Sequence, residues 1–162
     1  MKNKITASIS TIFATTLLGL TLAAPARAAD AVNPCAAKLS PGAQKIIQRP
    51  ADYRPFKGDP AQLAKLGESL FNDPKLSTNG TACASCHRNG AAFKASFGQP
   101  FPHRVAMAAQ AYGMKEVHLD EAIQMCMIGP MANRPLPWDS KELAGLAAYL
   151  GGLQKNFVAA DK

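Results

Sequence analysis

Cys83-Ala84-Ser85-Cys86-His87 is the stretch of sequence that decides the fold. Two thiols three residues apart can each form a thioether with one of the two vinyl groups on a single porphyrin edge, and the adjoining imidazole then lies beneath the iron. We therefore predict one covalently attached haem c, held by Cys83 and Cys86, with His87 as the proximal axial ligand. A redox dithiol would need a βαβ context and a zinc site a second pair of ligands, and the sequence contains neither pattern.

The first 28 residues have the features of a secretory signal peptide. Lys2 and Lys4 precede an apolar segment at about 12–24, and Ala26-Arg27-Ala28 has the small-x-small form of a cleavage site. The apolar segment contains threonines and is shorter than the ~20 residues of a membrane-spanning helix. We expect cleavage after Ala28, export to the bacterial periplasm and no stable membrane insertion of the mature chain. Attachment of haem to thiols fits such a compartment.

The charge of the chain is mildly basic. The formal net charge is +7 at pH 7 for all 162 residues, and loss of the basic leader and addition of two haem propionates would both lower it. The remaining bias does not predict binding to nucleic acid. It is compatible with docking onto an acidic redox partner protein, which stays unidentified.

The rest of the chain divides into an arm, an all-α domain and a tail. Residues 29–58 are interrupted by prolines and are expected to form an N-terminal arm with one short helix within 40–48, attached to the body by Tyr53 and Phe56. Residues 59–157 are expected to form the domain, and residues 158–162 a tail. No pattern typical of a strand is present.

Helix signals place three to five helices and long loops in the domain. Asp59 is expected to cap a helix that starts at Pro60 and ends before Pro74. Further helices are expected at about 105–112, ending at Gly113, at 119–127, and after Asp139, where Asp139 and Glu142 resemble a capping box. In the loop that follows the haem motif, a carbonyl near Pro100 is expected to accept from the ring of His87.

The order of these elements resembles that of the small class I cytochromes c. Gly67 and Phe71 on one helix, the Cys-x-x-Cys-His motif, a methionine loop, and Leu146-x-x-Tyr149-Leu150 on the last helix carry the resemblance, over about residues 60–155. It implies a cytochrome c-like fold wrapped around one haem, with the first and last helices crossing at the glycine and aromatic positions. The spacing of Met131 from the last helix implies that Met131 is the distal ligand. Ala132 follows it where that family has proline.

Two narrower resemblances point toward enzymes. The run 70–81, Leu-Phe-Asn-Asp-Pro-Lys-Leu-Ser-Thr-Asn-Gly-Thr, is similar to the segment that leads into a haem domain of dihaem cytochrome c peroxidases. The stretch 126–140 is similar to the haem domain of thiosulfate dehydrogenases, which implies Cys126 as an alternative iron ligand. Both enzyme classes use two haems, whereas this chain contains one Cys-x-x-Cys-His.

The distal ligand therefore stays open between several residues. Met131 is the first candidate and Cys126 the second. Met125, Met127, His103, His118 and an open iron site are further possibilities, although methionines on helices more often pack in cores. A thioether ligand raises the reduction potential and suits electron transfer, whereas a thiolate ligand lowers it.

Cys35 and Cys126 are left over from the haem motif. In an oxidising compartment two such thiols most simply form a disulfide, and this bridge would exclude Cys126 as an iron ligand. The leading interpretation is a periplasmic monohaem cytochrome c that carries single electrons between redox partners. The alternative is a haem enzyme or enzyme subunit, peroxidase-like or thiosulfate-dehydrogenase-like, with Cys126 ligation or an open iron site.

Overall fold

The computed structural model describes residues 42–157, and these residues form an all-α structure, which confirms the predicted class. The α-helices are α1 (Ala43–Ile47), α2 (Pro60–Phe71), α3 (Cys83–His87), α4 (Ala106–Tyr112), α5 (Leu119–Ile128) and α6 (Lys141–Lys155). The 3-10 helices are η2 (Pro74–Leu76), η3 (Arg88–Gly90) and η4 (Ala95–Gly98). Between residues 42 and 157 no helix has the length and hydropathy needed to cross a membrane.

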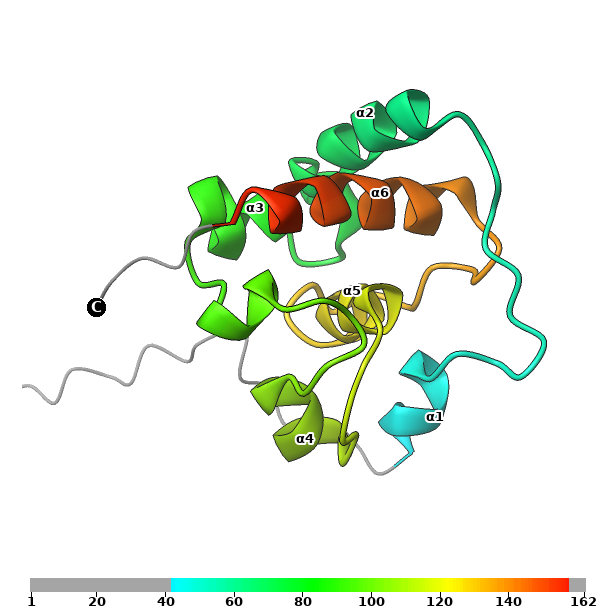
Figure 1. The fold of residues 1–162 in the computed structure, drawn as a ribbon, viewed down its shortest axis with the longest axis vertical. Helices are drawn as coiled ribbons and strands as arrows, with labels where there is room; N and C mark the ends of the chain where they lie inside the picture. The colour runs from blue at the N-terminus through cyan, green and yellow to red at the C-terminus, as the bar shows by residue number, and fades with distance from the viewer. Residues whose placement is uncertain (1–41, 158–162) are drawn as a thin grey trace, which may run out of the picture. The chain divides into compact units, whose positions relative to one another are not determined.

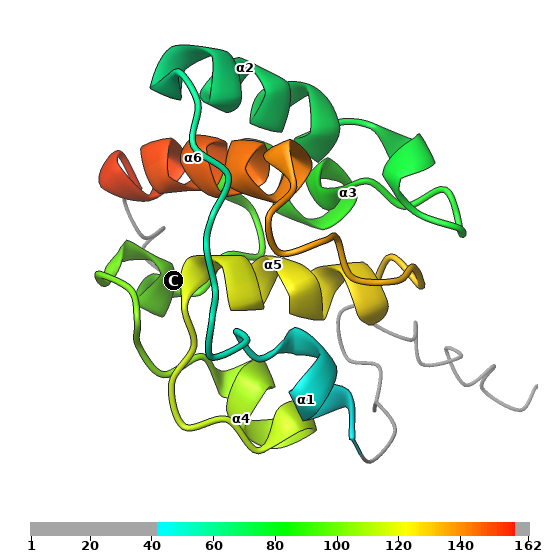
Figure 2. The ribbon, with the colours of Figure 1, turned by 90° about the vertical axis from the view of Figure 1, so that its right-hand side faces the viewer.

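Helices α2 and α6 lie side by side and cross at a pair of glycines (Figures 1 and 2). A Cβ atom on Gly67 would overlap the carbonyl of Gly145, so only a residue without a side chain permits this approach. Next to the crossing, the rings of Phe71 and Tyr149 pack with their centroids 5.3 Å apart. The expected crossing at the glycine and aromatic positions is therefore present.

Helix α5 lies between two hydrophobic clusters. In both views it runs beneath α6, and α1 and α4 lie on its other side (Figures 1 and 2). Met127 belongs to the cluster shared with α2 and α6, whereas Met125 belongs to the cluster shared with α1 and α4. The buried members of the first cluster are Phe71, Ala84, Phe97, Ile123, Met127, Met131, Leu143, Leu146 and Leu150. Those of the second are Ile47, Ala108, Tyr112, Met114, Val117 and Met125.

The described part of the arm, residues 42–58, is attached more firmly than its sequence indicates. Ile47 is fully buried in the second cluster, and Arg49 forms a salt bridge with Asp120 at the start of α5. The ring of Tyr53 packs edge-on against Trp138, which confirms Tyr53 as an attachment point. Phe56 is 42% exposed and lines a shallow hollow together with Leu63 and Leu66 of α2, and its role as an anchor stays a prediction.

Most helix boundaries follow their local signals. The carboxylate of Asp59 accepts from the N–H of Gln62 at 2.9 Å, and Gly113 ends α4 in the left-handed region, as predicted. The predicted capping box at Asp139 is wrong by one residue. Ser140 is the N-cap of α6, because its hydroxyl accepts from the N–H of Leu143 at 3.2 Å.

Several expectations lie outside the described residues. These are the signal peptide at 1–28, the first part of the arm, the tail at 158–162 and Cys35 with its expected disulfide. They remain predictions.

We predict that Gly67→Ala destabilises the protein by about 2 kcal/mol or more, because the added methyl group must push α2 away from the backbone of α6. Urea unfolding followed by circular dichroism measures the change. Gly152→Ala on α6 is the matched control, since its added Cβ would meet no described atom within 4 Å outside the adjoining turns of its own helix. It should be neutral or stabilising by up to about 1 kcal/mol, and equal losses in both variants would contradict the proposed contact.

Candidate functional site

The haem motif forms its own short helix, α3. The N–H of Ala82 donates to the hydroxyl of Ser85 at 3.1 Å, and this bond fixes the first turn. Cys83 and Cys86 are three residues apart on this helix, so both thiols lie on one side of it, and both residues are partly buried. The spacing that the sequence predicts for attachment to one porphyrin edge is therefore realised on a helix.

His87 is the last residue of α3, and its ring is fixed on two sides. Nδ1 lies 3.3 Å from the carbonyl oxygen of Ala91, and the ring stacks on Phe93 with centroids 4.1 Å apart. The expected partner near Pro100 is wrong, because that carbonyl faces His103 instead. Burial lowers the pKa of His87, although the Ala91 carbonyl partly opposes this shift. A neutral ring whose Nδ1–H donates to a carbonyl leaves its Nε2 lone pair for a metal.

Met131 lies next to the haem motif although it is far away in sequence. Its side chain is 2% exposed, and its Sδ atom is 3.8 Å from the Sγ atom of Cys83. Burial is the main reason that the pKa of the Cys83 thiol rises to about 11, so this thiol is uncharged at neutral pH. The structure thus brings Met131 and Cys83 together in one apolar environment.

The loop that carries Met131 is hydrogen-bonded to the segment that leads into α3. The N–H of Thr78 donates to the Met131 carbonyl at 3.3 Å, and its hydroxyl donates to the carbonyl of Ala132 at 2.6 Å. The side-chain amide of Asn79 donates to Pro130 O at 2.9 Å, and that of Asn133 donates to Leu76 O at 2.7 Å in the reverse direction. The sequence of residues 76–79 gives no local signal for these contacts with residues 130–133.

The other side of the loop is attached to α5 through Gln124. Its side-chain amide is fully buried, donates to the carbonyl of Leu136 at 2.7 Å and accepts from the N–H of Leu136 at 2.9 Å. The N–H of Met131 also donates to the carbonyl of Cys126 at 3.0 Å. These bonds close the loop into a compact turn with Met131 inside it.

The remaining candidate ligands lie on or near α4 and α5. Met125 is buried in the second cluster, whereas Met127 shares the first cluster with Met131. Cys126 lies between them and is partly buried. His118 is the N-cap residue of α5, and its N–H donates to the Glu121 carboxylate at 2.8 Å.

His103 has an unusual environment. It is 7% exposed, its Nδ1 atom lies 3.2 Å from the carbonyl oxygen of Pro100, and its ring packs on Phe101. Its buried Nε2 atom has no hydrogen-bond partner within the described part of the chain. A buried nitrogen without a partner is unfavourable by about 1–3 kcal/mol, so this atom is a candidate for contact with a bound group.

The donor set fits a haem better than a bare metal ion. In the range 42–157, no group of three or more His, Cys, Asp or Glu side chains is arranged to hold a metal. The available donors are two thiols on one helix, a neutral imidazole and a buried thioether, which suit thioether attachment and axial ligation of a porphyrin iron.

A comparison with protein-family models gives a match to this region. The model described as di-haem cytochrome c peroxidase matches residues 61–142, just over half of the chain. The chain belongs to the di-haem cytochrome c peroxidase family. The sequence resemblance to the haem domains of these peroxidases is thus confirmed, and the protein is a haem protein of the cytochrome c type. No curated protein and no solved structure gave a match.

The region matched by the family model, residues 61–142, includes both the segment 73–82 and the Met131 loop. The di-haem family name contrasts with the one Cys-x-x-Cys-His in this chain. Arg49 and the arm lie before the matched region, and the last part of α6 lies after it.

We predict that Gln124→Leu destabilises the protein by about 2 kcal/mol, because it removes a fully buried amide and leaves the partly buried N–H and C=O of Leu136 without their partners. Chemical unfolding monitored by fluorescence of Trp138 measures the loss. Gln110→Leu, which removes the same amide from an exposed position on α4, should stay within about 0.5 kcal/mol of the wild type. Similar values for the two variants would refute the role of Gln124 in closing the loop.

Proposed function

We propose that this protein is a periplasmic monohaem c-type cytochrome that carries single electrons. In this proposal Cys83 and Cys86 hold the haem through thioethers, His87 is the proximal ligand and Met131 the distal ligand. The observation that carries it is the 3.8 Å contact between the buried Met131 Sδ and the Cys83 Sγ, which is made across a large sequence separation.

In this proposal, His87 and Met131 are held in place and keep water away from the iron. His87 stays neutral because burial lowers its pKa, and the Ala91 carbonyl and the ring of Phe93 restrict its rotation. Met131 is held by a hydrogen-bonded loop and excludes water from its side of the site. Bound haem supplies an iron that gains or loses one electron. Ligands that are fixed in this way move little when that charge changes, which favours electron transfer over binding of a new ligand.

The enzyme alternative is supported by two observations. The family is named for peroxidases, and the buried Nε2 of His103 lacks a partner in the described range. A peroxidase-like or thiosulfate-dehydrogenase-like protein would use Cys126 or His103 as a ligand, or leave the iron open. Which side chain is the distal ligand therefore separates the two functions.

We predict that Met131→Ala abolishes the methionine-to-iron charge-transfer band of the ferric protein, lowers the reduction potential and allows carbon monoxide to bind the ferrous protein. The reason is that loss of the thioether opens a coordination position and removes a potential-raising ligand. Absorption spectra of both oxidation states, with and without carbon monoxide, measure all three effects.

Met127→Ala is the matched control, because Met127 is equally buried in the same cluster. It should keep the band. His103→Ala and Cys126→Ser complete the set, and the band should survive in both. If the band is absent from the wild type, or if peroxide or thiosulfate is turned over rapidly, the carrier function is wrong and the variant that changes the spectrum identifies the ligand.

The proposed compartment is the periplasm, and it rests on the leader at residues 1–28. Mass spectrometry of the exported, unreduced protein tests it together with the disulfide. We expect a mature chain that starts after Ala28 and carries a Cys35–Cys126 bridge. A chain that keeps its leader would contradict export.

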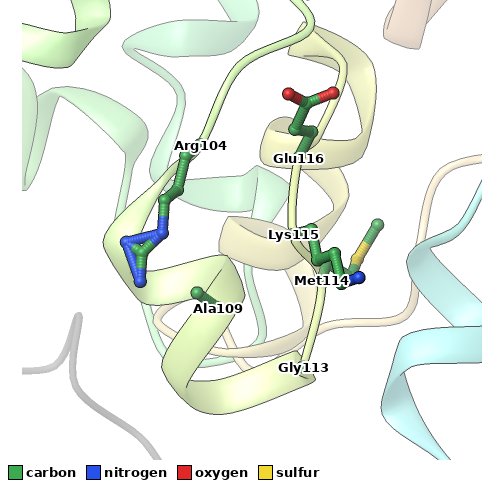
Figure 3. A pocket seen from close by; sticks show the side chains of 6 residues that line it. All are labelled: Arg104, Ala109, Gly113, Met114, Lys115 and Glu116. Carbon is green, nitrogen blue, oxygen red and sulfur yellow. The ribbon is translucent and has the colours of Figure 1, made fainter.

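The proposed partner is an acidic redox protein. The sequence from 74 to 115 contains no Asp or Glu and includes Lys75, Arg88, Lys94, Arg104 and Lys115, all of which are exposed. Arg104 and Lys115 border a shallow hollow of about 500 Å³ from opposite sides, with Glu116 at its rim (Figure 3). Lys94 follows Phe93, whose ring stacks on His87, so this cation lies beside the haem motif and can steer an acidic surface toward it.

We predict that Lys94→Glu slows oxidation of the reduced protein by ferricyanide about fivefold at low ionic strength, and accelerates oxidation by a cationic cobalt phenanthroline complex. The reason is that a charge reversal near the haem changes the local concentration of a charged oxidant. Stopped-flow absorbance measures both rates. Lys65→Glu on α2 is the control and should change neither. Equal effects of the two variants would show that only net charge matters.

A further inference from the structure

Arg49, a residue of the arm, donates several hydrogen bonds to acidic side chains of α5. Its Nε donates to Oδ1 and Oδ2 of Asp120 at 2.9 and 3.0 Å, and its Nη2 donates to Oδ2 at 2.9 Å. Its backbone N–H also donates to Oε1 of Glu121 at 3.0 Å. The arm is thus bonded to two consecutive acids in the first turn of α5.

Burial distinguishes this contact from an ordinary surface salt bridge. Asp120 is 3% exposed and Glu121 is 4% exposed. The N–H groups of Glu121 and His118 donate to these carboxylates, and the positive end of the helix dipole favours them, but Arg49 is the cation in the salt bridge. Without Arg49, the start of α5 would have to open to hydrate its acids.

The arm also contacts a residue that follows Met131 in the sequence, Trp138. The guanidinium of Arg49 packs over the ring of Tyr53 at 4.7 Å, and that ring packs against Trp138 with centroids 5.5 Å apart. Asp120 and Trp138 are on opposite sides of Met131 in the sequence. The arm therefore joins the two ends of the segment 120–138, which contains the Met131 loop.

We propose that Arg49 is a positioning residue for Met131: residues 47–53 brace the two ends of the segment 120–138 and so keep the Met131 loop against the haem motif. The part that concerns iron ligation rests on the proposed function, whereas the brace itself does not. Residues 47–53 lie outside the region matched by the family model, whereas Asp120 and Trp138 lie inside it.

Hydrogen exchange of the full-length haem-loaded protein, read by mass spectrometry, tests the brace. Arg49→Met should speed exchange in peptides from residues 125–134 at least about tenfold, which corresponds to ~1.4 kcal/mol. Peptides of α2 should exchange as in the wild type. Arg49→Met combined with Asp120→Asn avoids leaving a buried carboxylate unpaired and should give the same result if the single variant fails to fold.

Arg54→Met is the matched control, since the exposed Arg54 side chain donates to the neighbouring carbonyl of Tyr53 and to no other group between residues 42 and 157. It should leave residues 125–134 unchanged. The brace is overturned if exchange in 125–134 stays at the wild-type rate in the Arg49 variants while the arm itself exchanges faster.

The ligand part of the proposal is read from spectra of the same variants. Arg49→Met should weaken the methionine-to-iron band and speed carbon monoxide binding, whereas Arg54→Met should do neither. An unchanged band in a variant with a loosened loop would overturn the positioning role. A wild type without the band would instead show that the proposed function has failed, and the exchange result would still decide whether the brace exists.

Discussion

The hydrogen bonds between residues 76–79 and residues 130–133 are the constraint on which the site depends. They join the segment that leads into α3 to the loop that contains Met131, in both directions. The crossing of α2 and α6 closes the chain around these two segments, and Gln124 fixes the loop from the side of α5. Without these bonds the Met131 side chain could occupy many positions. The bonds hold it against the haem motif.

Local signals in the sequence were sufficient for much of the fold. Asp59 begins one helix and Gly113 ends another through interactions within a few residues, so both roles can be predicted without knowledge of the tertiary structure. The all-α class and the glycine crossing follow from helical periodicity and from the resemblance. Ser140 took the cap expected for Asp139 because two adjacent residues can both serve as a cap, and only the path of the loop decides between them.

Tertiary contacts of polar groups could not be predicted in this way. The ring of His87 uses the carbonyl of Ala91 and not one near Pro100, since the choice among nearby carbonyls depends on how the loop returns. By their sequence position, Asp120 and Glu121 are acids in the first turn of a helix, whereas in the structure both are buried and accept from Arg49. Two acids in an otherwise apolar helix imply a cationic partner, because buried carboxylates require one. The sequence does not indicate which cation this is.

The salt bridge of Arg49 has a consequence for the order of folding. Its two partners are 71 residues apart, and α1 has five residues, too few to be stable alone. The arm therefore cannot dock until α5 has formed its first turn. Contacts of such long range form late, and the crossing of α2 and α6 at Gly67 and Gly145 spans a still longer stretch of chain, so both contacts follow the formation of their helices. Docking of the arm is therefore a late step that depends on the prior formation of α5.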